Sequence, residues 1–207
     1  MSRFRRALAF GWLVLFLATP GSGQSPVGTP AAKVRSSASN AAPPPPAELV
    51  IDTAEGEIVI RLLPDVAPAH VAHLIKVAKA GGYDGTTFHR IIAHGIIQGG
   101  DPLSKDPAKS AQYGTGGLGL LKAEFSDRPF VRGAVGAARR SHKDSGGSQF
   151  FICLADQTAL NGQYTLLGEV VSGLQAADRI GDTPVDGDKP QTRVEMRKVS
   201  IRSPAGN

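Results

Sequence analysis

Hydrophobic and polar residues alternate over many short stretches of the chain after residue 47. Residues 49–53 and 57–62 are rich in branched apolar side chains, and the short turn between them predicts an opening β-hairpin. Further runs bounded by Gly, Asp, Asn or Pro predict strands at residues 87–92, 95–98, 133–138, 149–154 and 164–171. A closing strand is expected over residues 194–201, where the alternation slips once, as at a bulge. So many short strands favour a barrel.

Helical spacing replaces this alternation in two segments. Apolar residues at positions 71, 74, 75 and 78 define one face of a predicted helix over residues 67–80, which begins near Pro68 and ends at Gly81. A second, shorter helix is predicted over residues 173–180. Residues 103–118 are polar and contain several glycines, so we expect a surface loop with a role in recognition.

The first 47 residues have a different character. Three arginines precede an apolar run over residues 7–18 and a small, turn-prone segment at 20–23, which is the pattern of a secretory signal peptide over residues 1–23. The apolar run is short for a membrane-spanning helix, so we expect cleavage near Gly23, export to a periplasm or to the outside medium, and no stable membrane insertion. Residues 24–47 are rich in Pro, Ala and Ser, which indicates a disordered linker.

The composition fits one globular domain over residues 48–203. The chain has 207 residues and is 41% hydrophobic, enough to bury one sizeable core. Its formal net charge is +5, but three of the basic residues are the arginines of the predicted signal, so nothing indicates a nucleic-acid partner. Cys153 is the single cysteine, which excludes a disulfide within one chain.

Two long motifs carry a family resemblance. Residues 83–92 read Tyr-Asp-Gly-Thr-Thr-Phe-His-Arg-Ile-Ile and continue to Gln-Gly-Gly-Asp at 98–101, while residues 147–152 read Gly-Ser-Gln-Phe-Phe-Ile. Both resemble signatures of the cyclophilins, which are peptidyl-prolyl cis-trans isomerases, and they occur in the family's order. Shorter similarities at 114–117, 123–125, 160–162 and 168–171 extend the likeness to about residues 48–202. The resemblance implies a mainly β fold, a closed eight-stranded antiparallel barrel capped by two α-helices.

The implied activity is rotation about the peptide bond that precedes proline. That rotation meets a barrier of about 18–20 kcal/mol, because resonance joins the nitrogen lone pair to the carbonyl. A guanidinium that donates a hydrogen bond to the prolyl nitrogen as it becomes pyramidal stabilises the twisted state more than the planar one. Arg90 is the candidate for this donor, and Gln98 is expected to hold the arginine or the substrate backbone by its amide.

The resemblance also implies a set of substrate-binding residues. Phe151 and Leu160 are expected to line the proline pocket, whereas Phe150 points to the opposite side of its strand and fills the core. Ala138 matches a small residue at the neighbouring subsite, where backbone groups pair with an extended peptide. The predicted substrate-binding residues are His89, Ile96, Ala138, Gln149, Phe151, Leu160 and Tyr164. His89 is a secondary candidate, because amide rotation requires no proton transfer.

The sequence departs from the family pattern around this pocket. Gly95 and Ile96 replace the usual Phe-Met pair, Ala159 stands where Trp or Phe is common, and Leu167 stands where Phe is usual. A wider and shallower pocket is therefore expected, with proline affinity weaker by about one to two decades. Poor binding of cyclosporin is expected too, since the family contacts it with a tryptophan at the Ala159 position. The alternative function is a catalytically weak or inactive module that binds proline-containing peptides.

Other readings of the sequence have less support. A metal-dependent hydrolase would need a ligand motif that the five histidines lack, although His70 and His73 share a predicted helix face. The glycines at 116–119 lack the lysine of a phosphate-binding loop, and the basic residues Arg139, Arg140 and Lys143 fit either a solvated surface or a preference for acidic substrates. We expect no cofactor, a monomer, and proline-containing peptides and unfolded exported proteins as partners.

Overall fold

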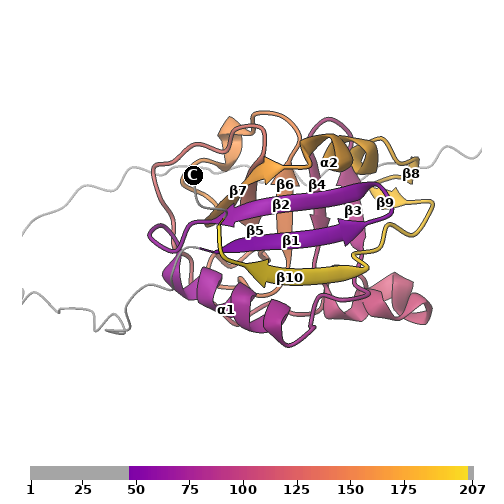
Figure 1. The fold of residues 1–207 in the computed structure, drawn as a ribbon, viewed down its shortest axis with the longest axis horizontal. Coiled ribbons are helices and arrows are strands. Elements are labelled where there is room, and N and C mark those ends of the chain that lie inside the picture. The colour runs from indigo at the N-terminus through magenta and orange to yellow at the C-terminus, as the bar shows by residue number, and fades with distance from the viewer. Residues whose placement is uncertain (1–46, 205–207) are drawn as a thin grey trace, which may run out of the picture. The chain divides into compact units, whose positions relative to one another are not determined.

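The computed structural model describes residues 47–204. The predicted signal peptide and nearly all of the predicted linker lie outside these residues. The central element is an eight-stranded antiparallel sheet with the strand order β10-β1-β2-β7-β5-β6-β4-β3 (Figure 1). Its strands are β1 Glu48–Thr53, β2 Gly56–Leu62, β3 Phe88–Ile92, β4 Ile96–Gly99, β5 Ala134–Ala137, β6 Phe150–Cys153, β7 Leu166–Ser172 and β10 Lys198–Arg202.

Every strand predicted from the alternation is present, and so are both predicted helices. Helix α1 (Pro68–Lys79) lies below the sheet in the view of Figure 1, and α2 (Leu174–Gly181) lies above it. The short hairpin of β8 (Val185–Asp186) and β9 (Lys189–Pro190) was not predicted, because two-residue strands leave no alternation to detect. The expected surface loop contains two 3₁₀ segments, η1 Pro102–Lys105 and η2 Pro107–Gln112, and a third, η3 Thr158–Leu160, follows β6.

The prediction of a closed barrel is not confirmed. Strands β3 and β10 are the two edges of a curled sheet, and no ladder joins them. Hydrogen bonds join the start of β3 and the residues before it to the segment that precedes β10: Gly85 N donates to Met196 O, Met196 N to Thr86 O, and Phe88 N to Val194 O. The residues before β10 thus pair with one end of the sheet before the strand itself pairs with β1. This change of partner explains why the alternation slips between Met196 and Val199, both of which are buried.

Two apolar clusters fill the domain. The larger lies inside the curled sheet and beneath both helices, and it includes Phe88, Phe150 and Met196. The smaller includes Phe130, Phe151 and Leu166 on the other side of β5, β6 and β7. Phe150 and Phe151 therefore face opposite sides of β6, as the alternation of a strand requires.

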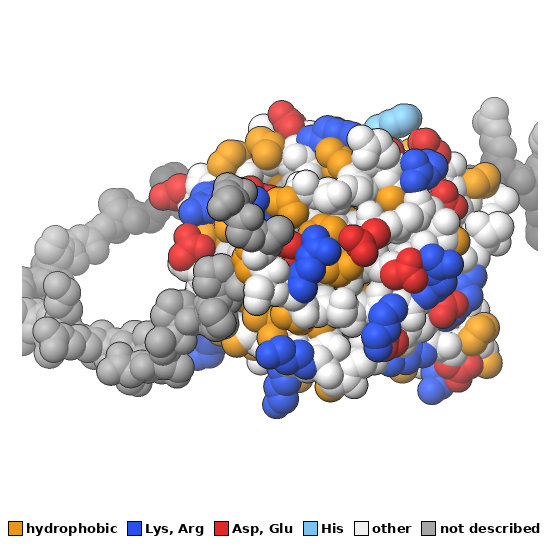
Figure 2. All heavy atoms as spheres, viewed as in Figure 1, with side chains coloured by type: hydrophobic (Ala, Val, Ile, Leu, Met, Phe, Trp, Pro, Cys, Tyr) orange, Lys and Arg blue, Asp and Glu red, His pale blue; other side chains and the backbone are white. Residues whose placement is uncertain are grey.

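The described surface shows no separation of charge on the face drawn in Figure 2, and neither described helix is of the membrane-spanning kind. On the face shown in Figure 2, acidic and basic side chains are intermixed rather than gathered by sign. Pairs such as Arg202 with Glu48 and Arg197 with Asp52 contribute to this pattern. Neither α1 nor α2, the helices of the described part of the chain, has the length and apolar character needed to cross a bilayer.

The start of helix α1 is held by a carboxylate from a distant loop. Ala67, the residue before the helix, offers no side-chain cap. Glu124 instead accepts hydrogen bonds from the backbone N–H groups of Ala69 and His70, at 3.0 and 2.9 Å, and from His70 Nδ1 at 2.6 Å. Burial alone would raise the pKa of Glu124, but the hydrogen bonds from His70 and from the helix backbone lower it below its ordinary value.

We predict that Glu124→Gln lowers the free energy of unfolding at pH 7 by about 1–3 kcal/mol, because the helix loses a charged acceptor. Since the folded pKa of Glu124 is lowered, its contribution is present above the ordinary carboxyl pKa and is lost as the pH falls through the folded value. The free energy of unfolding of Glu124→Gln should therefore approach that of the unmodified protein as the pH falls, and urea denaturation between pH 7 and pH 3 measures this difference. Glu169→Gln, on an exposed position of β7, is the matched control. Equal stability of Glu124→Gln and the unmodified protein at pH 7 would contradict the capping role.

Candidate active site

An irregularity in β3 sets the direction of the candidate catalytic side chain. Phe88 pairs with Gly99 and Arg90 pairs with Gln98, although Gly99 and Gln98 are adjacent in β4. His89 is therefore the extra residue of a β-bulge in β3. The extra residue allows Phe88 and Ile91 both to enter the core, while Arg90 remains half-buried at the surface. Such bulges commonly redirect side chains beside functional sites. The local sequence thus places a cation at the edge of an apolar region.

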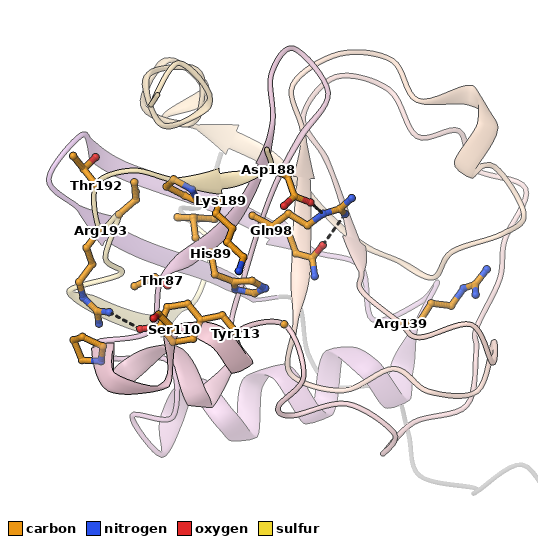
Figure 3. A pocket seen from close by; sticks show the side chains of 16 residues that line it. Thr87, His89, Gln98, Ser110, Tyr113, Arg139, Asp188, Lys189, Thr192 and Arg193 are labelled. Carbon is orange, nitrogen blue, oxygen red and sulfur yellow. Dashed lines mark hydrogen bonds and ion pairs between the residues drawn. The ribbon is translucent and has the colours of Figure 1, made fainter. Parts of the chain in front are cut away.

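Two neighbours hold the guanidinium of Arg90. Its Nε donates to Asp188 Oδ2 at 2.7 Å, and its Nη1 donates to Gln98 Oε1 at 3.3 Å. Figure 3 shows the side chains of Asp188 and Gln98 meeting the same guanidinium. The Nη2 amino group makes no hydrogen bond with the described residues. Arg90 is therefore fixed in orientation and keeps a donor available for a substrate.

A chain of amides connects Gln98 to the backbone. Gln98 Nε2 donates to Gln149 Oε1 at 3.0 Å, and Gln149 Nε2 donates to the carbonyl of Gly116 at 2.7 Å. Gln149 is fully buried, whereas Gln98 is half-exposed. The structure thus brings the predicted residues Arg90, Gln98 and Gln149 into one network, with Gln149 behind the surface and not on it.

An apolar hollow of about 220 Å³ lies beside Arg90. Phe151 forms its floor and meets Tyr164 edge to face, with ring centroids 5.5 Å apart. Gly136, opposite Phe151 on β5, has no room for a Cβ atom because the Phe151 ring occupies that space. The guanidinium carbon of Arg139 lies 4.6 Å from the centroid of the Tyr164 ring, a cation–π arrangement. Aromatic and cationic groups thus build one wall of the hollow.

Most of the predicted site residues meet at this hollow. Its lining includes seven of them: Arg90, Ile96, Gln98, Ala138, Phe151, Leu160 and Tyr164. Their individual roles stay predictions. The sequence reasoning did not include Ile92, Gly95 or Gln157 among the site residues, nor Arg139 as a lining residue, although all four line the hollow. The sequence had indicated Gly95 as a departure from the family pattern and Arg139 as part of a basic cluster. Asp188, which binds Arg90, was not predicted as a site residue because its hairpin was not predicted.

Three positions that depart from the family pattern lie in different places relative to the hollow. Gly95 lines the hollow, so the missing side chain does leave its wall thinner. Ala159 is exposed and does not line the hollow. The expectation for Leu167 was wrong: the residue is 3% exposed and packs in the larger core cluster, because its side of β7 faces the inside of the sheet. Leu167 therefore does not affect the width of the hollow.

A larger cavity of about 520 Å³ lies on the other side of Arg90. Arg90, Gln98 and Arg139 line both spaces, so the two meet along this row of polar side chains. His89 lines the larger cavity and not the apolar hollow, as a result of the bulge. The predicted role of His89 in substrate binding therefore stays a prediction, and the residue lies one step away from the apolar surface.

The residues that suggested other chemistries have structural contacts. His70 is buried and pairs with Glu124, and within residues 47–204 no three His, Cys, Asp or Glu side chains are grouped as metal ligands. Burial raises the pKa of the Cys153 thiol to about 12, so the group stays protonated. Gly116 and Gly117 pack closely against Asp101 and Ser148, which leaves no cradle for a phosphate.

Comparisons with known proteins agree with this geometry. The family described as cyclophilin type peptidyl-prolyl cis-trans isomerase/CLD matches residues 48–201. A probable peptidyl-prolyl cis-trans isomerase of Brucella suis biovar 1 is 44% identical over 137 residues, which cover 64% of this chain and 70% of the relative. Peptidyl-prolyl cis-trans isomerase B of Bacillus subtilis is 42% identical over 132 residues, covering 62% of this chain and 86% of the relative.

A solved structure supports the same fold. A Cryptosporidium parvum cyclophilin type peptidyl-prolyl cis-trans isomerase, crystallised in the presence of the dipeptide Ala-Pro, superimposes with a TM-score of 0.68 and 27% identity. The match covers 75% of this chain and 99% of that structure. The motifs, the eight-stranded sheet with two helices and these relatives lead to one conclusion. The chain belongs to the cyclophilin-type peptidyl-prolyl cis-trans isomerases.

Proposed function

We propose that this isomerase acts on proline-containing segments of exported proteins, with Arg90 as the residue that stabilises the twisted peptide bond. One observation carries the proposal: Asp188 and Gln98 fix the guanidinium at the rim of an apolar hollow, and its Nη2 group remains available. The hollow offers Phe151 and Leu160 to the proline ring. A donor then lies where the prolyl nitrogen gains lone-pair character.

The physical step is a change in hydrogen bonding, without bond cleavage. In the planar amide the nitrogen lone pair is delocalised and accepts poorly, whereas in the twisted state it is localised and accepts well. The hydrogen bond from Arg90 is therefore stronger in the transition state than in the ground state, which is the condition for catalysis. Because Asp188 and Gln98 already orient the guanidinium, little reorganisation accompanies the step.

Substrate binding combines the hollow with backbone pairing. Ala138 lines the hollow directly after β5, and its N–H is already bound to the Gln149 carbonyl. Its carbonyl group can therefore pair with an extended segment whose proline enters between Phe151 and Leu160. The related Cryptosporidium parvum structure was obtained in the presence of Ala-Pro, which supports a proline-containing ligand for this site as well. Unfolded clients expose such segments, and a monomer suffices for this mode of binding.

We predict that Arg90→Ala lowers kcat/KM by about 100-fold or more, because the mutation removes a donor used in the transition state. A protease-coupled assay on proline tetrapeptides at low temperature, where the uncatalysed rate is small, measures this loss. Arg90→Lys keeps the charge without the planar fork and should recover only part of the rate. Circular dichroism establishes that each variant is folded.

Two results of this assay would contradict the assignment. If a folded Arg90→Ala variant kept its full kcat/KM, Arg90 would not be the catalytic donor. If the unmodified protein bound proline peptides without accelerating their isomerisation, the chain would be a peptide-binding module of cyclophilin fold, the alternative that the altered pocket wall suggests.

We predict that Ala159→Trp strengthens binding of proline peptides by about tenfold, because an indole supplies the aromatic wall that alanine is too short to form. The same change should create measurable affinity for cyclosporin. Isothermal titration with both ligands tests this, and Thr158→Trp, one residue earlier in η3, is the positional control. An unchanged affinity in Ala159→Trp would show that the open wall does not limit binding.

We predict that the exported protein begins near Gln24, because residues 1–23 have the charge, apolar run and small residues of a cleaved signal. Intact-mass measurement of protein recovered from the periplasm or the medium gives the new terminus. Leu15→Arg, which interrupts the apolar run, should retain the protein inside the cell at full length. Recovery of the full-length chain from the exported fraction would contradict cleavage.

A further inference from the structure

The larger cavity beside Arg90 has a polar lining that the isomerisation step does not use. It is bounded by β3, by η2 and by the segment from Asp188 to Val194. Four cationic side chains line it, Arg90, Arg139, Lys189 and Arg193, against one carboxylate, Asp188. That carboxylate is already bound to Arg90 at 2.7 Å. The cavity therefore favours a ligand of negative charge.

His89 gives the cavity an unsatisfied hydrogen-bonding group. Its side chain is buried, with 7% of the residue exposed, and neither ring nitrogen makes a well-aligned hydrogen bond with the described residues. Burial lowers the pKa of His89, and the nearby Asp101 and the backbone of Thr87 oppose this shift only in part. A buried polar group without a partner is destabilising unless something pairs with it. A neutral imidazole donates through one nitrogen and accepts through the other.

Lys189 has a charged group that makes neither a hydrogen bond nor an ion pair with a described residue, so it can pair with a ligand. Arg193 is fully engaged, since it donates to Ser104 O, Gly85 O and the Tyr113 hydroxyl and pairs with Glu195. Lys189 makes no ion pair with a described residue and lies on β9. Figure 3 shows its side chain extending across the cavity toward the ring of His89. Lys189 on β9 and His89 on β3 thus both line this cavity.

We propose that this cavity binds the carboxylate of a client side chain, a glutamate or aspartate within two residues of the target proline. The proposal rests on the proposed function and narrows its substrate class. Arg90 and Gln98 line both spaces, so a peptide whose proline fills the apolar hollow has its neighbouring residues at the mouth of the cavity. An extended residue advances the chain by about 3.3 Å, so a glutamate side chain from either flank is long enough to enter.

The nearby carboxylates do not oppose this ligand strongly. Asp188 is neutralised by Arg90, and Asp101 lies behind His89 with its oxygens already bound to the backbone N–H groups of Leu103, Gly114 and Gly116. A volume of about 520 Å³ accommodates a carboxylate side chain together with water. A lysine or arginine side chain in the same place would be repelled by the ammonium of Lys189, which is unpaired among the described residues, so the cavity discriminates by charge.

The test compares matched peptides that differ only in one charge. Labelled peptides carry Ala-Pro at the centre and Glu, Gln or Lys at each of the two positions before and after this pair, and fluorescence anisotropy gives their Kd. At the favoured position we expect Glu to bind about three- to tenfold more tightly than Gln, with Lys weakest, and the difference should shrink as salt is added. The nitrogen resonances of the His89 ring should shift with the Glu peptide and not with the Gln peptide.

Variants connect the preference to the cavity. Lys189→Gln should abolish most of the Glu preference, and Lys189→Glu should reverse it in favour of the Lys peptide. Lys79→Gln, on the last turn of α1, removes the same charge outside the cavity lining and should leave the Glu preference unchanged. Equal affinities for Glu and Gln at every position would overturn the proposal. A Glu preference that survives Lys189→Gln would also overturn it.

The coupled assay separates this proposal from the proposed function. Preferential binding of the Glu peptide without acceleration would sustain the carboxylate site and refute the isomerase role. Acceleration of Glu and Gln peptides with the same kcat/KM and the same Kd would sustain the isomerase role and refute the carboxylate site. Failure of every peptide to bind would refute both.

Discussion

The buried carboxylate of Asp101 is the constraint on which the active face depends. It is fully buried, and it accepts backbone hydrogen bonds from Leu103 at 2.8 Å, from Gly114 at 2.5 Å and from Gly116 at 3.2 Å. These contacts fold the loop over residues 102–118 onto the end of β4 and place the Gly116 carbonyl against Gln149. A carbonyl only accepts and a guanidinium only donates, so the two amides between them have a single consistent orientation, with each nitrogen toward Gly116 and each oxygen toward Arg90. The position of Arg90, the proposed catalytic donor, is therefore set by a loop that begins twelve residues after it in the chain.

The apolar hollow is asymmetric, and this asymmetry increases the importance of Arg90. On one side Phe151 packs against Phe130 and Tyr164, and Arg139 covers the Tyr164 ring, so this wall is rigid. Elsewhere the hollow is lined by Gly95, which has no side chain, and the exposed Ala159 does not line the hollow at all. In the proposed binding mode a proline ring would contact the rigid wall on one face, and burial of apolar area alone would orient it less firmly than an enclosed pocket would. In the proposed mechanism the directional hydrogen bond from Arg90 therefore contributes to orientation as well as to catalysis.

Local patterns in the sequence predicted most of the fold, while the site depended on contacts between distant segments. Alternation and helical spacing found the strands of the main sheet and both helices, and the two motifs identified Arg90, Gln98 and Gln149. The open edge between β3 and β10 could not be predicted, because an eight-strand count is the same for a closed and an open sheet. Asp188 could not be identified from the sequence because it lies in the turn between two strands of only two residues each. Its backbone carbonyl accepts a hydrogen bond from Ile91 N, which holds it beside β3. Leu167 was misplaced because a family position was read as a wall residue without deciding which face of β7 it occupies.

In the proposed mechanism, the groups around Arg90 that would affect the rate of rotation differ from those that would affect which substrate binds. Amide rotation moves no proton, and neither a guanidinium nor a glutamine amide changes its charge near neutral pH. The geometry that stabilises the twisted bond is therefore independent of pH over the range in which the protein is folded. The neighbouring cavity adds a titratable ring and a further cation, because His89 and Lys189 line it and do not line the apolar hollow. Because Asp188 and Gln98 hold Arg90 at two different nitrogens, the proposed ligand of the cavity can change affinity without displacing the guanidinium. Selection and catalysis thus share one residue and are kept apart by the two contacts that fix it.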